Sequence, residues 1–269
     1  NAADPGTANY LNDQGSEVSE FYSYIASGFF TTFMNESKDG YDWVPELANE
    51  KPVALNDNGG MATKWRFEVK TGSDLKYSTN STIESRKAFN GREVVAEDYV
   101  TPFKLLLTKS NGYFRGSKEY YEKTANGVDN ALFDSTVGIK CYEENGKTYF
   151  EYEFTTPVTQ FYSMYYISSS LYMPVPQEFL DLVTVENYLG FNADKTETPV
   201  DNSLSLGAYT LETWNNGQEV VYKKNPNYVY ASSKYAIEGV HMNILPAAGT
   251  DPEAGLKEVI AGNTDSSGI

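Results

Sequence analysis

The stretch SLGAYTLETWNNGQEVVYKKNP, residues 205–226, decides the fold of this chain. Residues 209–214 and 219–222 alternate between apolar or β-branched side chains and polar ones, which is the period of a strand half-buried in a sheet. Asn215-Asn216-Gly217 lies between these two runs and supplies residues that tolerate a positive φ in a tight turn. Pro226 cannot donate to a sheet ladder, so it ends the second run. The stretch therefore predicts a β-hairpin.

Two further regions carry the same strand signal. Residues 64–70 alternate between polar and apolar side chains, and we expect one strand there. Residues 137–142 and 147–154 also alternate, and Glu144-Asn145-Gly146 separates them. Because Asn-Gly between two alternating runs favours a two-residue turn, these residues predict a second hairpin.

Helical periodicity predicts a helix from Val18 to Met34, with Ser16 as its cap and with an apolar stripe at Phe21, Ile25, Phe29 and Phe33. We expect further helices over residues 97–108, 117–123, 177–189 and 252–262. Pro102 is expected to bend the first of these near its start. Thr250 or Asp251 is expected to cap the last, with Pro252 in its first turn and Gly262 at its end.

The composition excludes several classes of protein. The chain has 269 residues, of which 40% are hydrophobic, so it can bury a core as one large domain or two ordinary ones. Its net charge of −16 argues against a nucleic-acid partner, because phosphate binding needs clustered Lys and Arg. No apolar run approaches the ~20 residues that a membrane-spanning helix needs. Residues 1–5 carry no basic, apolar signal segment, so we expect either a cytosolic protein or one whose signal has been removed.

The residues that usually hold metals and cofactors are scarce. Cys141 is the only cysteine and His241 the only histidine, which leaves no disulfide and no cysteine or histidine metal set. Both lie in strand-like runs, and we expect Cys141 to be a buried packing residue and His241 a structural or surface residue. The chain carries no glycine-rich phosphate loop, HExxH or CxxC motif, so we expect no metal and no cofactor.

The order of residues around the first hairpin resembles a known family. The pattern G-x-Y-x-L-x-x-W begins at Gly207, G-Q-x-apolar-x-apolar begins at Gly217, and N-P-x-Y begins at Asn225. This is similar to the signature of the extracellular solute-binding proteins, family 5, which serve peptide importers. Further matches follow in the same order along the chain, at Pro45-Glu46-Leu47-Ala48, at Val137-Gly138-Ile139-Lys140, at Pro174-Val175-Pro176 and at Ala261-Gly262-Asn263-Thr264-Asp265.

The resemblance implies an α/β fold like that of the periplasmic binding proteins (type II, cluster C). This chain would supply the first lobe, with a mixed β-sheet and helices, together with an inserted subdomain rich in hairpins. We expect residues 1–40 to form the first part of lobe I and 41–160 the inserted subdomain. Residues 161–269 would form the rest of lobe I, up to the crossover to a second lobe that this sequence lacks.

The resemblance also implies a function without catalysis. The chain would be the substrate-binding component of an ABC importer, a monomer that captures an oligopeptide between two lobes and delivers it to permease subunits. It would lie in the periplasm, or outside the cytoplasmic membrane as a lipoprotein. The residues that the family places near the cleft are Asp13, Gln14, Gly15, Ser169, Ser170, Tyr172, Ser205, Leu206 and Gly207.

Another class of function stays open at this point. The chain has 22 Tyr residues and 37 Asp and Glu residues, and aromatic platforms with paired carboxylates are typical of carbohydrate-active enzymes and carbohydrate-binding proteins. Most of these aromatic residues are expected in the core. A peptide sensor with no transport role would share the same fold.

Overall fold

The computed structural model describes residues 4–12, 15–107, 112–125, 129–231, 237–245, 251 and 253–266. The chain forms two compact units. Unit 1 comprises Asn1–Ile25, Tyr77–Gly91 and Leu180–Ile269, and unit 2 comprises Ala26–Lys76 and Arg92–Phe179. Each unit is therefore assembled from segments that are distant in the sequence.

The main sheet of unit 2 has four antiparallel strands in the order β3-β4-β8-β7. They are β3 (Val53–Ala54), β4 (Ala62–Glu68), β8 (Lys147–Val158) and β7 (Ile139–Glu144). Asn145 and Gly146 join β7 to β8 with φ values of 53° and 76°, as the two-residue turn requires. The strand predicted near residues 64–70 and the hairpin predicted around this turn are thus confirmed.

One face of this sheet carries an aromatic core. Phe67, Phe150 and Tyr152 are buried, while the residues between them carry polar side chains. Phe29 lies 4.7 Å from Phe150 between ring centroids, and Tyr99 stacks on Phe29 at 5.5 Å. Many of the aromatic residues therefore pack in the core, as expected from the sequence.

Helices and two small sheets complete unit 2. The helices are α3 (Ala96–Leu106), α4 (Ser117–Thr124), α5 (Asn130–Thr136), α6 (Gln160–Ile167) and the short η2 (Ser170–Tyr172). One small sheet pairs β1 (Phe30–Met34) with β2 (Tyr41–Pro45), and the other pairs β5 (Gly72–Lys76) with β6 (Glu93–Val94). The helices predicted near 97–108 and 117–123 are confirmed as α3, which contains Pro102, and α4.

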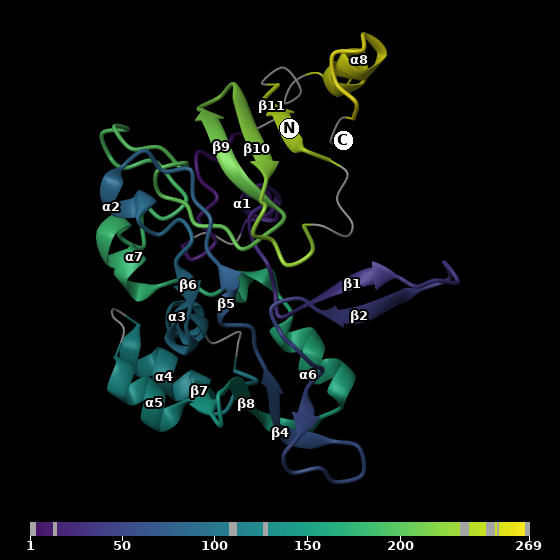
Figure 1. Ribbon diagram of the computed structural model, residues 1–269, viewed down its shortest axis with the longest axis vertical. Coiled ribbons are helices and arrows are strands. Elements are labelled where there is room, and N and C mark those ends of the chain that lie inside the picture. The colour runs from purple at the N-terminus through teal and green to yellow at the C-terminus, as the bar shows by residue number, and fades with distance from the viewer. Residues whose placement is uncertain are drawn as a thin grey trace. The chain divides into compact units, whose positions relative to one another are not determined.

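Unit 1 is built on the hairpin that the sequence predicts. The strands β9 (Tyr209–Asn215) and β10 (Glu219–Lys224) pair antiparallel, and β11 (Gly239–Asn243) pairs with the other edge of β10 (Figure 1). The helices are α1 (Ser16–Tyr22), α2 (Glu84–Lys87) and α8 (Ala254–Ile260), while α7 (Gln177–Val183) carries the chain from one unit into the other. His241 lies on β11, half-exposed, as a surface residue beside Glu219.

The long helix predicted from Val18 to Met34 is wrong beyond its first turns. Helix α1 ends at Tyr22, and Phe30–Met34 is strand β1, paired with β2. At Gly28 a Cβ would lie 2.2 Å from the carbonyl oxygen of Ser168, so the backbone approaches another segment more closely than a helix with side chains allows. Pairing with β2 overrides the local helical period. Ser16 is also not the cap, because Gly15 occupies that position without a side-chain hydrogen bond.

Two more helices are shorter than the sequence suggests. Helix α7 ends at Val183 rather than at residue 189, and α8 begins at Ala254, with Glu253 at its N-cap. Asp251, one of the two predicted caps, is therefore not the N-cap, although its carboxylate accepts from the N–H of Glu253 at 2.9 Å. Thr250 and Pro252 lie outside the described residues. The division into residues 1–40, 41–160 and 161–269 stays a prediction, since it concerns lobes rather than these two compact units.

Among the helices of the described residues, none combines the length and the apolar character that crossing a bilayer would require.

Candidate functional site

The side chain of Asn225 holds the base of the signature hairpin together. Asn225 is fully buried, and its Nδ2 donates to the carbonyl oxygen of Gly207 at 2.9 Å. Its Oδ1 accepts from the hydroxyl of Ser78 at 2.8 Å and from the backbone N–H of Asn227 at 3.0 Å. Because each polar atom of this amide has a partner inside the unit, Asn225 is a structural residue of the signature.

Ser205, Leu206 and Gly207 gather around one carbonyl oxygen. The oxygen of Ile25, three residues beyond α1, accepts from the N–H of Gly207 at 2.8 Å, from the N–H of Leu206 at 3.2 Å and from the hydroxyl of Ser205 at 2.9 Å. Ser205 and Leu206 are 2% and 1% exposed. The side chains of these predicted ligand residues are therefore enclosed within unit 1, where they join the hairpin to the segment after α1. Their contact with a ligand stays a prediction.

The turn of the same hairpin is anchored by an acidic residue near the amino terminus. The carboxylate of Asp4 accepts from the N–H of Gly217 at 2.6 Å and from the indole Nε1 of Trp214 at 3.2 Å. The Trp214 ring also stacks on Phe21 of α1, with 5.1 Å between centroids. Sequence reasoning missed Asp4, because a turn-like Asp-Pro-Gly gives no sign of a partner more than two hundred residues away.

The predicted residues of the early loop are only partly described. Asp13 and Gln14 lie outside the described residues. Gly15 is half-buried at the N-cap of α1, where its carbonyl oxygen accepts from the N–H of Ser19 at 3.0 Å. Since α1 leads to Ile25, the early loop and the 205–207 segment are connected within unit 1 through one short helix.

The remaining predicted residues belong to unit 2. Ser169 and Ser170 are half-buried at the start of η2, where the Ser169 hydroxyl oxygen accepts from the N–H of Leu171 at 3.3 Å. Tyr172 is 5% exposed, and its ring stacks on Phe103 at 4.2 Å and 7°. Its hydroxyl lies 3.2 Å from that of Tyr113. Ser169 and Ser170 therefore keep exposed surface, whereas Tyr172 supports the core beneath them.

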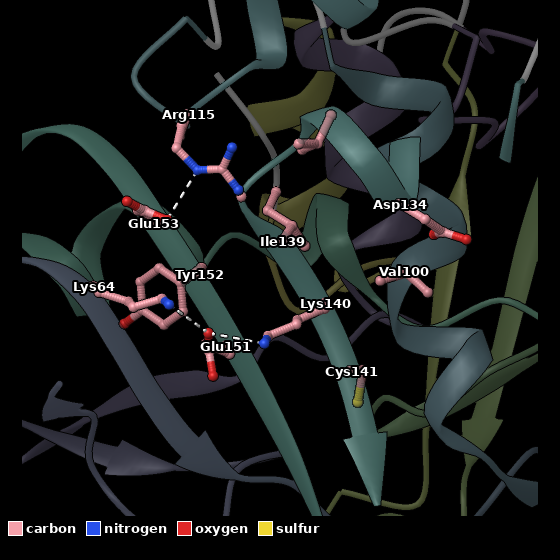
Figure 2. A pocket seen from close by; sticks show the side chains of 12 residues that line it. Lys64, Val100, Arg115, Asp134, Ile139, Lys140, Cys141, Glu151, Tyr152 and Glu153 are labelled. Carbon is pink, nitrogen blue, oxygen red and sulfur yellow. Dashed lines mark hydrogen bonds and ion pairs between the residues drawn. The ribbon is translucent and has the colours of Figure 1, made fainter. Parts of the chain in front are cut away.

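Unit 2 also contains a cavity of about 410 Å³ that sequence reasoning did not predict. It follows residues 137–141, from the end of α5 into β7, and reaches Val100 of α3 and Asp134 of α5. Figure 2 shows Val100 and Asp134 on the side of β7 that faces away from β8. The cavity also meets a row of charged side chains on the outer face of the sheet, which are Lys64, Arg115, Lys140, Glu151 and Glu153.

Each charge in this row has a partner of opposite sign, although two lysines share one carboxylate. Glu151 Oε1 lies 3.3 Å from Lys64 Nζ and 3.1 Å from Lys140 Nζ, and Glu153 pairs with Arg115 at 2.9 Å (Figure 2). Burial raises the pKa of Glu151, but hydrogen bonds from Lys140 and Tyr142 outweigh burial, so its pKa lies below the usual range.

A glycoside hydrolase needs a carboxylic acid with a raised pKa as its proton donor. Because the pKa of Glu151 is shifted the opposite way, this carboxylate does not fit that role. The alternating charged positions of β4, β7 and β8 were a signal for the row, but strand pairing was needed to bring these residues together.

The thiol at the edge of the cavity is not activated. Cys141 is half-buried on β7, and burial raises the pKa of its thiol well above the usual range. Within the part of the chain that the structure describes, no cluster of His, Cys, Asp and Glu could hold a metal ion.

Comparison with known proteins decides the family. Residues 89–267 match the bacterial extracellular solute-binding proteins, family 5 (middle region). This chain belongs to that family. The match takes in the signature hairpin and extends over more than half of the chain, so the family predicted from the sequence is confirmed.

A curated relative of this family member is the periplasmic oligopeptide-binding protein OppA of Salmonella typhimurium. The two are 27% identical over 222 residues, which is 81% of this chain and 36% of the relative. The chain therefore spans little more than a third of the length of this relative.

Solved structures give the same fold. OppA of Listeria monocytogenes bound to peptide matches 98% of this chain with a TM-score of 0.69 at 16% identity. OppA of Haemophilus influenzae in complex with RPPGFSPFR matches 97% with a TM-score of 0.68 at 17% identity. The chain covers 44% and 43% of these two proteins. The fold is thus the periplasmic-binding-protein-like α/β fold that the sequence predicts.

Proposed function

We propose that this chain is part of the substrate-binding component of an ABC importer and helps to capture extracellular oligopeptides for delivery to a membrane permease. The observation that carries the proposal is the family match over residues 89–267. The structural likeness to OppA proteins with bound peptide supports oligopeptides as the ligand class. The proposed role is binding, without catalysis and without a cofactor. The lowered pKa of Glu151, which does not fit a proton donor, supports the absence of glycosidase chemistry at this row.

At residue level, we propose ligand-contacting residues in each unit taken by itself, in the early loop of unit 1 and at the start of η2 in unit 2. Gly15, Ser169 and Ser170 keep exposed surface that a peptide can contact, and Asp13 and Gln14 precede Gly15 directly. The segment 205–207 would contribute by holding the segment after α1 in place. Tyr172 would contribute by packing η2 against Phe103. The nine predicted residues would then divide into contacting and supporting groups.

The physical logic of such a site is recognition of the peptide backbone. An importer must accept peptides of unrelated sequence, and main-chain N–H and C=O groups are common to all of them. Side-chain pockets can then stay roomy, because ordered water adapts to each ligand. Closure of two lobes about a hinge would trap the peptide and signal to the permease. We propose a monomer, placed in the periplasm or anchored outside the cytoplasmic membrane as a lipoprotein.

Native mass spectrometry tests this proposal. The protein is purified without denaturation from its own host, grown in peptide-rich medium, and is activated in the gas phase. We expect a heterogeneous set of released peptide masses. A single sugar or metal-chelate mass would instead change the ligand class. A clean ligand-free mass, with no thermal shift from a peptide library, would refute the peptide assignment.

A further inference from the structure

Strand β7 leaves one edge of the main sheet of unit 2 unpaired within the described residues. In the order β3-β4-β8-β7, the other terminal strand, β3, has only two residues, whereas β7 has six. Across a two-residue turn, the flanking residues Glu144 and Lys147 form a hydrogen-bonded pair, and such pairs then alternate along the hairpin. The N–H and C=O groups of Ile139, Cys141 and Glu143 therefore point away from β8.

This edge opens onto the cavity of about 410 Å³. The cavity follows β7 through Ile139 and Cys141, and Val100 and Asp134 lie across from the strand (Figure 2). By contrast, the β9 edge in unit 1 is met by Asn80, whose Nδ2 donates to the carbonyl oxygen of Leu211 at 2.9 Å. An unpaired edge next to open space is a template for strand addition.

The charges left over along this edge are mostly acidic. Lys64 and Lys140 share Glu151, and Arg115 pairs with Glu153, so these ion pairs leave one positive charge in excess. In the described part of the chain, no ion pair engages the side chains of three exposed acidic residues, which are Glu97, Asp134 and Glu143.

The acidic residues lie near the edge. Asp134 lines the cavity, Glu143 is part of β7 itself, and Glu97 lies in the first turn of α3, the helix that also brings Val100 to the cavity. A cation, Lys104 of α3, lies over the ring of Phe133, 5.5 Å from its centroid. The three carboxylates outnumber the two remaining cations, which are Lys104 and the surplus lysine on Glu151, so the edge is complementary to a basic segment.

We propose that the β7 edge binds an extended peptide segment rich in Lys and Arg by strand addition, at a site separate from the importer ligand. The backbone of the segment would pair with Ile139, Cys141 and Glu143, and its cations would face Glu97, Asp134 and Glu143. Pairing with β7 of a second copy is disfavoured, because it would bring the same carboxylates of both copies together.

Photo-crosslinking of the full chain tests this site. The probe is a short peptide that alternates Lys and Val and carries a central p-benzoylphenylalanine. We expect cross-links to residues 137–143. Glu143→Pro removes an N–H from the free edge without touching the ladder to β8, so it should abolish them. Glu143→Gln is the matched control, because it keeps this N–H and should only weaken binding.

Charge is tested by the triple variant E97Q/D134N/E143Q, for which we expect about tenfold weaker binding of the Lys-Val peptide at low ionic strength. A Glu-Val peptide should not cross-link to β7. Cross-links in other segments, or cross-links that survive Glu143→Pro, would overturn the proposal. Sedimentation velocity provides the other check, since a dimer that Glu143→Pro abolishes would assign the edge to a second copy instead.

Discussion

Replacing Asn225 by alanine should destabilise unit 1 more than almost any other single change in the signature hairpin. The substitution removes the hydrogen bonds to the Gly207 carbonyl oxygen, the Ser78 hydroxyl and the Asn227 N–H, at a residue with 0% exposure. It also leaves the carbonyl oxygen of Gly207 without this donor in a buried environment.

The magnitude follows from these three bonds. A hydrogen bond contributes about 0.5–1.5 kcal/mol net, and a buried polar group left without a partner costs about 1–3 kcal/mol. The Ser78 hydroxyl can rotate, and the Asn227 N–H is near solvent, so the main penalty falls on Gly207. We expect a loss of about 3–4 kcal/mol in the free energy of unfolding, which is a large share of the ~5–15 kcal/mol typical of a domain.

Urea denaturation followed by far-UV circular dichroism measures the loss, and hydrogen exchange over residues 205–228 locates it. Asn227→Ala is the matched control. Asn227 is exposed, and its Nδ2 makes a single bond, to the Ser78 hydroxyl at 2.9 Å, so this change should cost about 0.5–1 kcal/mol. Asn225→Asp should be at least as damaging as Asn225→Ala, because it places a carboxylate oxygen against the Gly207 carbonyl oxygen.

Equal losses for Asn225→Ala and Asn227→Ala would refute the reasoning, because only the first residue is buried. A loss under about 1 kcal/mol for Asn225→Ala would refute it as well, since it would mean that water or a shifted backbone satisfies the Gly207 carbonyl.

Three further changes probe other parts of the chain. Gly116→Ala places a Cβ 2.1 Å from the carbonyl oxygen of Thr136 at φ +73°, so we expect a fall of several degrees or more in the melting temperature, measured by calorimetry. Tyr172→Phe removes the hydroxyl contact with Tyr113 and should cost about 1 kcal/mol in urea unfolding, whereas an unchanged stability would contradict this. Burial raises the pKa of Asp201, but hydrogen bonds donated by Thr198 and Thr82 outweigh burial, so the pKa is lowered overall. The ionised Asp201 carboxylate therefore stabilises the fold above its unfolded-state pKa, and this stabilisation is lost as the pH falls through its folded-state pKa. The difference in unfolding free energy between the native chain and Asp201→Asn should therefore be constant above about pH 5 and decrease in more acidic solution. A difference that increases in acid would contradict this.

The strands could be predicted where local signals agreed with tertiary pairing. In the signature hairpin and in β7–β8, an alternating pattern coincides with a turn that tolerates positive φ, and both hairpins form as predicted. Between Val18 and Met34 the signals conflict. The apolar stripe has helical period, but the close approach at Gly28 and the pairing of β1 with β2 determine the structure, and no local pattern reveals either.

The site was less predictable, because its contacts join distant segments. Asn225 meets Ser78 across 147 residues, and Asp4 meets Trp214 across 210. Spacing along one sequence cannot report such pairs. The cavity at β7 was missed for the same reason, since α3 and α5 form its far wall and strand pairing assembles its charged row.

The structure also explains why a strong family signature need not identify the ligand. Asn225 and Trp214 are buried, and their polar atoms are engaged within unit 1. Their chemistry fixes how the hairpin packs, and any ligand of the family could be served by the same packing. Under the proposed function, we expect selectivity between peptides to come from residues that keep exposed surface, such as Gly15, Ser169 and Ser170. Substitutions at these three positions should therefore change which peptides are retained while leaving stability nearly unchanged, whereas substitutions in the signature should do the reverse.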